Sequence, residues 1–183
     1  MMRRGAWIFL LAVSLGVCGS ALAADEKPQS NSTSQTTQNA TVDDGILAAY
    51  ADAIRYFNPK VTDPQARAVA RPVIVFGQAC GLDARLLVAA LAEEGRLDQI
   101  REDADGVLLA GRSPSIAVRS LAEDLSERVE WERYGNEVTE KILAAALRER
   151  AKDVLGRKSG KYADNVLRLY RKLSRTEQTT PKK

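Results

Sequence analysis

The stretch Gly81–Leu97, read GLDARLLVAALAEEGRL, decides the fold of this chain. Asp83 can cap a helix at its start, and Gly95 stands where a helix usually ends. The residues between them are mostly Leu and Ala, which favour the helix. At about 100° per residue, one side of this helix carries an apolar stripe made by Leu86, Leu87, Ala90 and Leu91. We therefore predict a central helix that buries this stripe in a helical core.

Glu94 falls within the apolar stripe, whereas Glu93 falls at its edge. Burial and the helix dipole both disfavour a charged carboxylate in the last turn of a helix. A carboxyl group that keeps its proton near neutral pH can serve as a general acid. Two interpretations stay open: Glu94 is a buried general acid, or it ends the helix and turns out to water past Gly95. In the first case, Glu94→Gln should stabilise the fold, because it removes a buried charge.

The composition limits the chemistry that is available. The chain has 183 residues and no histidine, which excludes Ser-His-Asp and Cys-His catalysis and the usual histidine metal sites. The acidic run Asp103–Gly106 resembles the middle of a calcium loop, but Arg101 and Arg112 occupy its first and last ligand positions. We expect neither a metal nor a cofactor.

Residues 1–23 have the features of a secretory signal peptide. The run begins MMRR, is apolar from Ala6 onward and ends in the small-x-small sequence Ala21–Ala23. Cys18 leaves a lipoprotein as an alternative, but Val17 before it is larger than the residue that such a site prefers. We predict a secreted or periplasmic protein, cleaved near Ala23, without stable membrane insertion.

Cleavage would also change the charge balance. It removes Arg3 and Arg4 from 27 basic residues, which leaves 25 against 24 acidic ones. A nearly neutral protein gives no reason to expect a nucleic-acid partner. Cys80 would be the remaining cysteine, so no internal disulfide is expected.

The rest of the chain predicts helices and no sheet. Residues 24–41 are Ser, Thr, Gln and Asn with few apolar residues, which indicates a disordered polar linker. Gly95–Ser113 is predicted to be a loop with at most a short helical turn. The helices are expected to begin near Asp44, Asp63, Asp83, Ser113 and Asn136, and to end with one over Tyr162–Leu173. We predict an all-α bundle of about six helices over residues 42–174, followed by a disordered tail at 175–183.

Two parts of the sequence resemble the lytic transglycosylase domain family, whose fold is all-α and similar to that of goose lysozyme. The first is the pattern Ile54-x-x-Phe57-Asn58-Pro59-x-Val61-Thr62 followed by Cys80–Glu94, which resembles the first half of the domain. The second is Lys161–Leu173, which resembles its closing Tyr-(Ala/Val)-x-x-Val helix. The resemblance implies a lysozyme-like fold and places the catalytic residue at Glu94. Glu93, Gly95 and Tyr162 are the neighbouring candidates for substrate binding, and Tyr162 also fits a place at the edge of the core.

The function that the resemblance implies is cleavage of peptidoglycan glycan strands. In that family one Glu protonates the glycosidic oxygen and then takes a proton from the C6 hydroxyl of the muramic sugar, which leaves a 1,6-anhydro product. This chain departs from the family at three places. Gly95 replaces a Ser, Gly106–Leu109 replaces Gly-Leu-Met-Gln, and Ala144–Arg148 replaces Ala-Tyr-Asn-Ala-Gly. Two alternatives therefore stay open: a catalytically impaired relative that binds glycan or an envelope protein partner, and a helical interaction domain unrelated to glycans.

Overall fold

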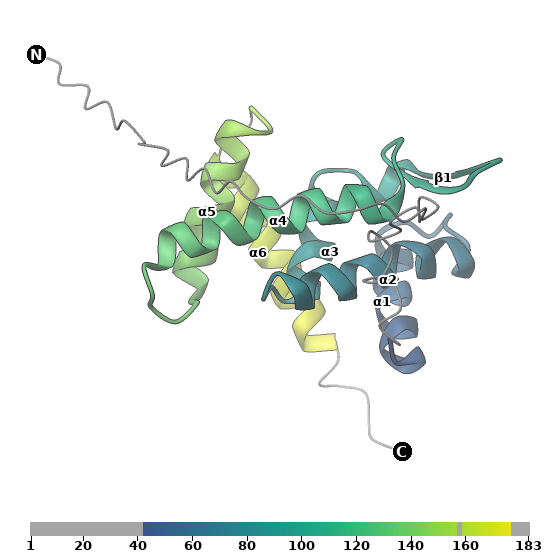
Figure 1. Cartoon of the computed structure of the whole chain (residues 1–183), viewed down its shortest axis with the longest axis horizontal. Coiled ribbons are helices and arrows are strands. Elements are labelled where there is room, and N and C mark those ends of the chain that lie inside the picture. Colours follow the sequence, from purple (N-terminus) through teal and green to yellow (C-terminus); the bar gives the residue numbers. More distant parts are fainter. Residues whose placement is uncertain (1–41, 157–158, 177–183) are drawn as a thin grey trace, which may run out of the picture. The chain divides into compact units, whose positions relative to one another are not determined.

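The computed structural model describes residues 42–156 and 159–176, which all belong to the compact unit formed by residues 39–183. These residues form six α-helices, one 3₁₀ turn and one two-stranded sheet (Figure 1). Their bounds are α1 Asp44–Phe57, α2 Asp63–Ala79, α3 Ala84–Glu93, η1 Leu97–Gln99, β1 Ile100–Asp103, β2 Gly106–Leu109, α4 Pro114–Arg133, α5 Glu140–Asp153 and α6 Ser159–Thr176. The prediction of an all-α bundle of about six helices is confirmed. The predicted signal peptide and linker, residues 1–41, lie outside the described residues.

Helix α3 lies at the centre of the bundle, in contact with α1, α2, α4 and α6. The predicted stripe is buried, with Leu86 2% exposed and Leu87, Ala90 and Leu91 not exposed at all. Ile54 and Val73 are fully buried in the same core, and Phe57 and Phe76 are half-buried against it. The prediction that this helix is the core of the fold is therefore confirmed.

Local hydrogen bonds explain where the first three helices begin. The Asp43 carboxylate accepts a hydrogen bond from the Ile46 N–H at 3.0 Å and caps α1, which begins at Asp44 as expected. Asp83 caps α3 as predicted, because its carboxylate accepts the Arg85 N–H at 2.9 Å. Helix α2 begins at Asp63 as expected, and Thr62 before it holds the capping position.

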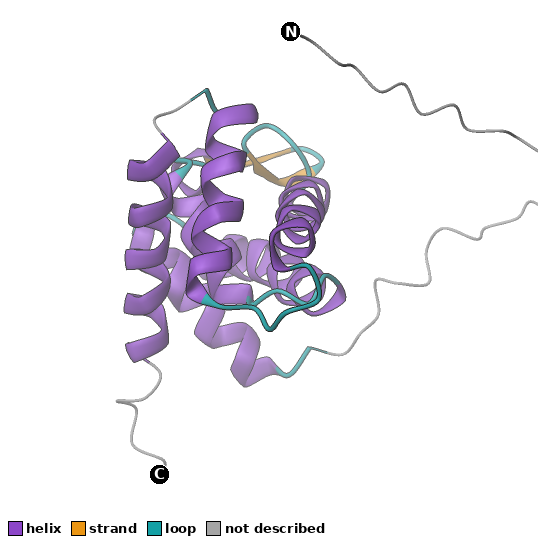
Figure 2. Cartoon of the chain, turned by 90° about the vertical axis from the view of Figure 1, so that its left-hand side faces the viewer, coloured by secondary structure: helices purple, strands orange, loops and turns teal. Residues whose placement is uncertain are grey.

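The segment after α3 was predicted to be a loop, and this is wrong over Ile100–Leu109. There β1 and β2 pair antiparallel, with Ile100 opposite Leu109 and Asp103 opposite Gly106 (Figure 2). The sequence IRED of β1 lacks the alternation that predicts a strand, because three of its four residues are charged and exposed. The hairpin forms around the turn residues between the strands, where the Asp105 N–H donates to the Asp103 carboxylate at 3.0 Å. The short helical turn expected in this segment is present as η1.

The second half of the unit consists of α4, α5 and α6, in which α5 contacts both α4 and α6. Helix α5 begins at Glu140, and its capping residue Thr139 lies three residues beyond Asn136, where the start was expected. Helix α6 continues to Thr176, beyond the expected boundary at residue 174.

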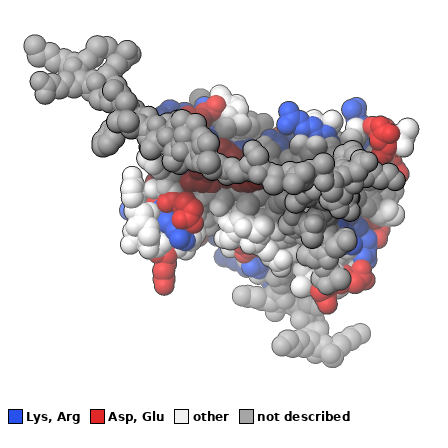
Figure 3. All heavy atoms as spheres, in the orientation of Figure 1, with Lys and Arg blue, Asp and Glu red and all other residues white. Residues whose placement is uncertain are grey.

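On the face shown in Figure 3, basic and acidic side chains lie next to one another around the visible surface. Within the described residues, no helix has both the length and the apolar composition needed to cross a membrane.

Candidate functional site

Glu94 is buried at the point where α3 ends. It is the residue that follows the last turn of α3, and its side chain is 2% exposed. The interpretation in which Glu94 ends the helix and its side chain turns out to water is therefore wrong. The fold therefore has to accommodate a buried carboxylate at the end of the central helix.

Two residues from distant parts of the chain meet the same oxygen of Glu94. The Nε of Arg150 on α5 donates to Glu94 Oε1 at 3.0 Å, and the Tyr162 hydroxyl on α6 donates to it at 3.0 Å. The Arg150 side chain is 3% exposed and Tyr162 is 2% exposed. Glu94 thus connects α3 to α5 and α6 through hydrogen bonds that are shielded from water.

The chain turns sharply after Glu94 and brings Arg96 back to it. Gly95 has a φ of +70°, the left-handed region that favours glycine, and the Arg96 N–H closes the turn on the Leu91 carbonyl at 3.0 Å. The Nε of Arg96 lies 2.7 Å from Glu94 Oε2. This contact is an ion pair whose geometry does not make a hydrogen bond, so Oε2 is buried without a hydrogen-bond partner among the described residues.

Burial and the contact with Glu94 shift the pKa values of Arg150 and Tyr162. Burial by itself would lower the pKa of Arg150, but the charge of Glu94 and its hydrogen bonds raise it. Burial raises the pKa of the Tyr162 hydroxyl, and the negative charge of Glu94 raises it further. At neutral pH Arg150 is therefore a cation and Tyr162 a neutral hydrogen-bond donor, both directed at Glu94.

The ion pairs continue from Glu94 to the surface. Arg150 also pairs through Nη1 with the Asp124 carboxylate on α4. Asp124 accepts from Arg128 Nε at 3.0 Å, and Arg128 Nη1 reaches Asp153 on α5 at 3.1 Å. We call this set the charge chain: Arg96, Glu94, Arg150, Asp124, Arg128 and Asp153. It joins the end of α3 to the exposed surface between α4 and α5.

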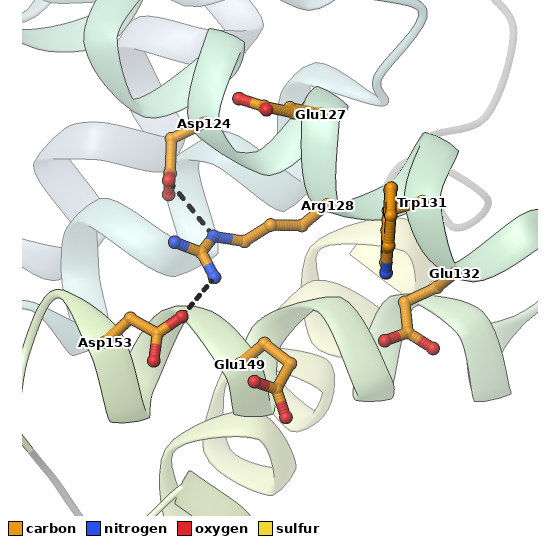
Figure 4. A pocket seen from close by; sticks show the side chains of 7 residues that line it. All are labelled: Asp124, Glu127, Arg128, Trp131, Glu132, Glu149 and Asp153. Atoms are coloured by element: carbon orange, nitrogen blue, oxygen red, sulfur yellow. Dashed lines mark hydrogen bonds and ion pairs between the residues drawn. The ribbon is translucent and has the colours of Figure 1, made fainter. Parts of the chain in front are cut away.

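A pocket of about 340 Å³ lies where the charge chain reaches that surface. Its carboxylates come from Asp124, Glu127, Glu132, Glu149 and Asp153, and it is completed by Arg128 and Trp131. Figure 4 shows Arg128 reaching across from α4 to Asp153, with the Trp131 ring standing beside it and the Glu132 and Glu149 carboxylates near the pocket. Glu94 does not line this pocket, and Asp124 is the residue that the pocket shares with the buried part of the chain.

The structure brings some of the predicted site residues together and separates others. Tyr162 meets Glu94 directly, and Gly95 shapes the turn beside it. Glu93 is half-buried and turns to α6, where it accepts a hydrogen bond from Asn165 Nδ2 at 3.0 Å. This hydrogen bond ties Glu93 to α6, the helix that also carries Tyr162.

Arg150 is one of several site residues that sequence reasoning missed, together with Arg96, Asp124 and Arg128. It lies one turn after the buried residues Ala146 and Leu147, so it falls on the apolar face of α5. A charged residue at helical spacing within an apolar face is the same signal that pointed to Glu94. The pairing of the two could not be inferred, because 56 residues separate them in the chain.

Comparison with known proteins adds no identification to this geometry. No protein-family model matches the chain, and no curated protein or solved structure matches it either.

Proposed function

We propose that this chain is an exported, lysozyme-like helical protein of the cell envelope that binds a partner and does not cleave glycan. The observation that carries the proposal is the state of Glu94, a buried carboxylate ion-paired with Arg150 and Arg96. The resemblance to lytic transglycosylases gives Glu94 the place of the catalytic residue. The contacts around it favour a structural role at that place.

A general acid must hold a proton and reach the oxygen that it protonates. Glu94 is poorly placed to reach such an oxygen, because its side chain is 2% exposed and lies 3.0 Å from the guanidinium of Arg150. The pocket between α4 and α5 does not include Glu94, so a ligand held there has no direct access to it.

The contacts of Glu94 also account for its presence without catalysis. Through Arg150 and Tyr162 it ties α3 to the two helices that close the bundle. A buried charge that loses its partner is costly, so the set of residues specifies how these helices are arranged. This explains how Glu94 can be retained in a chain that lacks the Ser, Gln and Tyr-Asn groups of the motifs that it resembles.

A second candidate is a lytic transglycosylase that uses Glu94. The observation in its favour is that Glu94 Oε2 makes no hydrogen bond and so keeps acceptor capacity that the fold does not use. Catalysis would require the Arg96 side chain, which is 26% exposed, to swing away and open Oε2 to the substrate. Glu94 would then act as both acid and base, as the resemblance implies.

Digestion of purified peptidoglycan separates the two candidates. The chain is incubated with peptidoglycan sacculi, and the soluble fraction is analysed by mass spectrometry for 1,6-anhydromuropeptides, with a known muramidase as the positive control for the substrate. We expect no product from the wild-type chain. Release of anhydro products by the wild type and not by Glu94→Gln would establish the transglycosylase instead. Product formed equally by both would mean that cleavage is unrelated to Glu94.

A further inference from the structure

We propose that the groove between α4 and α5 is a docking surface for a basic segment of a partner polypeptide, which places an Arg or Lys side chain against Trp131 between the carboxylates of Glu132 and Glu149. This rests on the proposed function in one respect, that the chain acts by binding. The groove consists of the pocket residues defined above together with Tyr134, the residue that follows α4.

The groove has an excess of negative charge, which favours binding of a cation. Five carboxylates and one guanidinium line the pocket, and Arg128 already pairs with Asp124 and Asp153. Lys152 approaches Glu149 at 3.9 Å from the same helix, at the limit of an ion pair. Glu127 and Glu132 have neither an ion pair nor a hydrogen bond among the described residues, and Glu132 is half-buried. A cation entering here would meet negative charge that the fold leaves uncompensated.

An exposed aromatic pair adds a second element to the surface. The side chains of Trp131 and Tyr134 are 72% and 79% exposed, and their ring centroids lie 6.2 Å apart. Large aromatic side chains that stay in water are typical of binding surfaces. An indole face beside carboxylates suits a guanidinium or ammonium group, which gains from the ring and from the anions together.

The arrangement favours an organic cation over a metal ion. In the part of the chain that the structure describes, no three Asp, Glu, Cys or His side chains converge closely enough to hold a metal. A volume of about 340 Å³ also admits a whole side chain, not only an ion. The exposed ring of Tyr134 extends the surface beyond the pocket, so residues that flank the inserted cation have a place to pack. These points favour a polypeptide over a small free amine.

Calorimetric titration with a defined peptide tests the inference. The probe is an acetylated and amidated peptide in which two Arg residues alternate with Ala, and the control peptide has citrulline in place of each Arg. Citrulline keeps the shape of the side chain and removes its charge. We expect the Arg peptide to bind the purified chain, more weakly as salt is raised, and the citrulline peptide to give no measurable heat of binding.

Three variants locate the binding site on the surface. Trp131→Ala should weaken binding roughly tenfold through loss of the cation–π contact, and Glu132→Gln should weaken it by a factor of roughly three to ten. Glu123→Gln is the matched control, because it removes the same charge from the same helix at a residue that pairs with Arg119 outside the groove. It should bind as the wild type does. Thermal unfolding of each variant checks that the fold is kept.

The results distinguish the inference from its rivals. Equal binding of both peptides, no binding at all, or equal losses for Glu132→Gln and Glu123→Gln would each overturn it. Binding of soluble peptidoglycan oligosaccharides that depends on Trp131, without binding of the Arg peptide, would make the groove a sugar-stacking surface and would also overturn it. These readouts are independent of the digestion assay, so the inference can fail while the chain is still found not to cleave glycan.

Discussion

The Nε of Arg150 lies 3.0 Å from Oε1 of Glu94, with both side chains at most 3% exposed. This pair joins the end of α3 to the middle of α5 across 56 residues of sequence. Because the carboxylate has a partner, the stabilisation expected from Glu94→Gln on the basis of sequence changes sign. Removing one charge now leaves the other in the core without full compensation.

Arg150→Met should therefore destabilise the fold by about 3–5 kcal/mol, because Glu94 loses its buried cation and keeps only the partly exposed Arg96. Urea unfolding followed by circular dichroism measures the loss. The double variant Glu94→Gln, Arg150→Met should recover a large part of it, since no buried charge then lacks its partner.

The control for the Arg150 substitution is Arg119→Met. Arg119 pairs with Glu123 in the same kind of contact, but their side chains are 63% and 55% exposed. An exposed pair of this kind contributes about 0–1 kcal/mol. An equal cost for Arg150→Met and Arg119→Met would contradict the structural role given to the buried pair.

Leu87→Ala should cost about 2–5 kcal/mol through lost burial and the cavity left behind. Leu87 is fully buried at the centre of α3. Ile116→Ala, at a side chain that is 59% exposed, serves as the comparison and should change stability by about 0.5 kcal/mol or less. Similar urea midpoints for the two variants would show that α3 is not the core of the fold.

Tyr162 should make stability fall at alkaline pH. Its pKa is raised in the folded state by burial and by the charge of Glu94, so above pH about 10 the unfolded state loses the phenolic proton while the folded state keeps it. The unfolded state then binds fewer protons, and the free energy of unfolding decreases as pH rises.

The test of this effect is the difference between the wild type and Tyr162→Phe. Phenylalanine cannot ionise and cannot donate to Glu94, so the variant should be less stable by about 1.5–3 kcal/mol near neutral pH. That difference should begin to shrink near pH 10 and continue to shrink as pH rises toward the higher, folded-state pKa. Tyr134→Phe, at an exposed ring, is the control. A difference that stays constant with pH would contradict the burial of the Tyr162 hydroxyl against a charged Glu94.

Asp83 should contribute stability that is lost in acid. Burial by itself would raise its pKa, but hydrogen bonds from Arg85 and from the Tyr170 hydroxyl outweigh burial and lower it. The contribution is complete above about pH 4 and is lost as pH falls through the lower, folded-state pKa. Asp83→Asn keeps a good capping residue, so it should cost about 1 kcal/mol at pH 7 and nothing at the acid end. Urea unfolding midpoints of the wild type and Asp83→Asn, measured from pH 7 into the acid range, give this cost. A cost independent of pH would refute the lowered pKa of Asp83.

The exported protein should begin at or near Ala24. This follows from the basic start, the apolar run and the Ala-Leu-Ala end of residues 1–23. Amino-terminal sequencing of the protein recovered outside the cytoplasm checks it. A lipid-modified Cys18 as the first residue would favour the lipoprotein alternative.

The helices of this fold could be predicted because each has its own local signals. Asp83 and Pro114 mark helix starts, and the spacing of Leu86, Leu87, Ala90 and Leu91 marks the face that is buried. These signals act over a few residues, so one sequence suffices to recognise them. The start of α5 was misplaced because Asn136 and Thr139 are both good capping residues, and only packing decides between them.

The hairpin and the partners of Glu94 could not be predicted in this way. The strand Ile100–Asp103 has no apolar alternation, and its pairing with Gly106–Leu109 depends on the turn between them. The contacts of Arg150 and Tyr162 with Glu94 span 56 and 68 residues and depend on how whole helices pack. Helical spacing alone places Glu94 on the buried face of α3. The cation that pairs with it, Arg150, comes from another helix.

The left-handed turn at Gly95 also bears on how such a chain can change over generations. A Cβ added there would meet no heavy atom within 4 Å, so a serine would fit in space, but the φ of +70° would cost it roughly 1 kcal/mol. The same turn positions Arg96 against Glu94. A serine at this position, as in the resembled motif, would strain the backbone and disturb an ion pair at once, without supplying the other groups of that motif. While Arg96 and Arg150 pair with the Glu94 carboxylate, selection for stability alone therefore favours keeping glycine at this position.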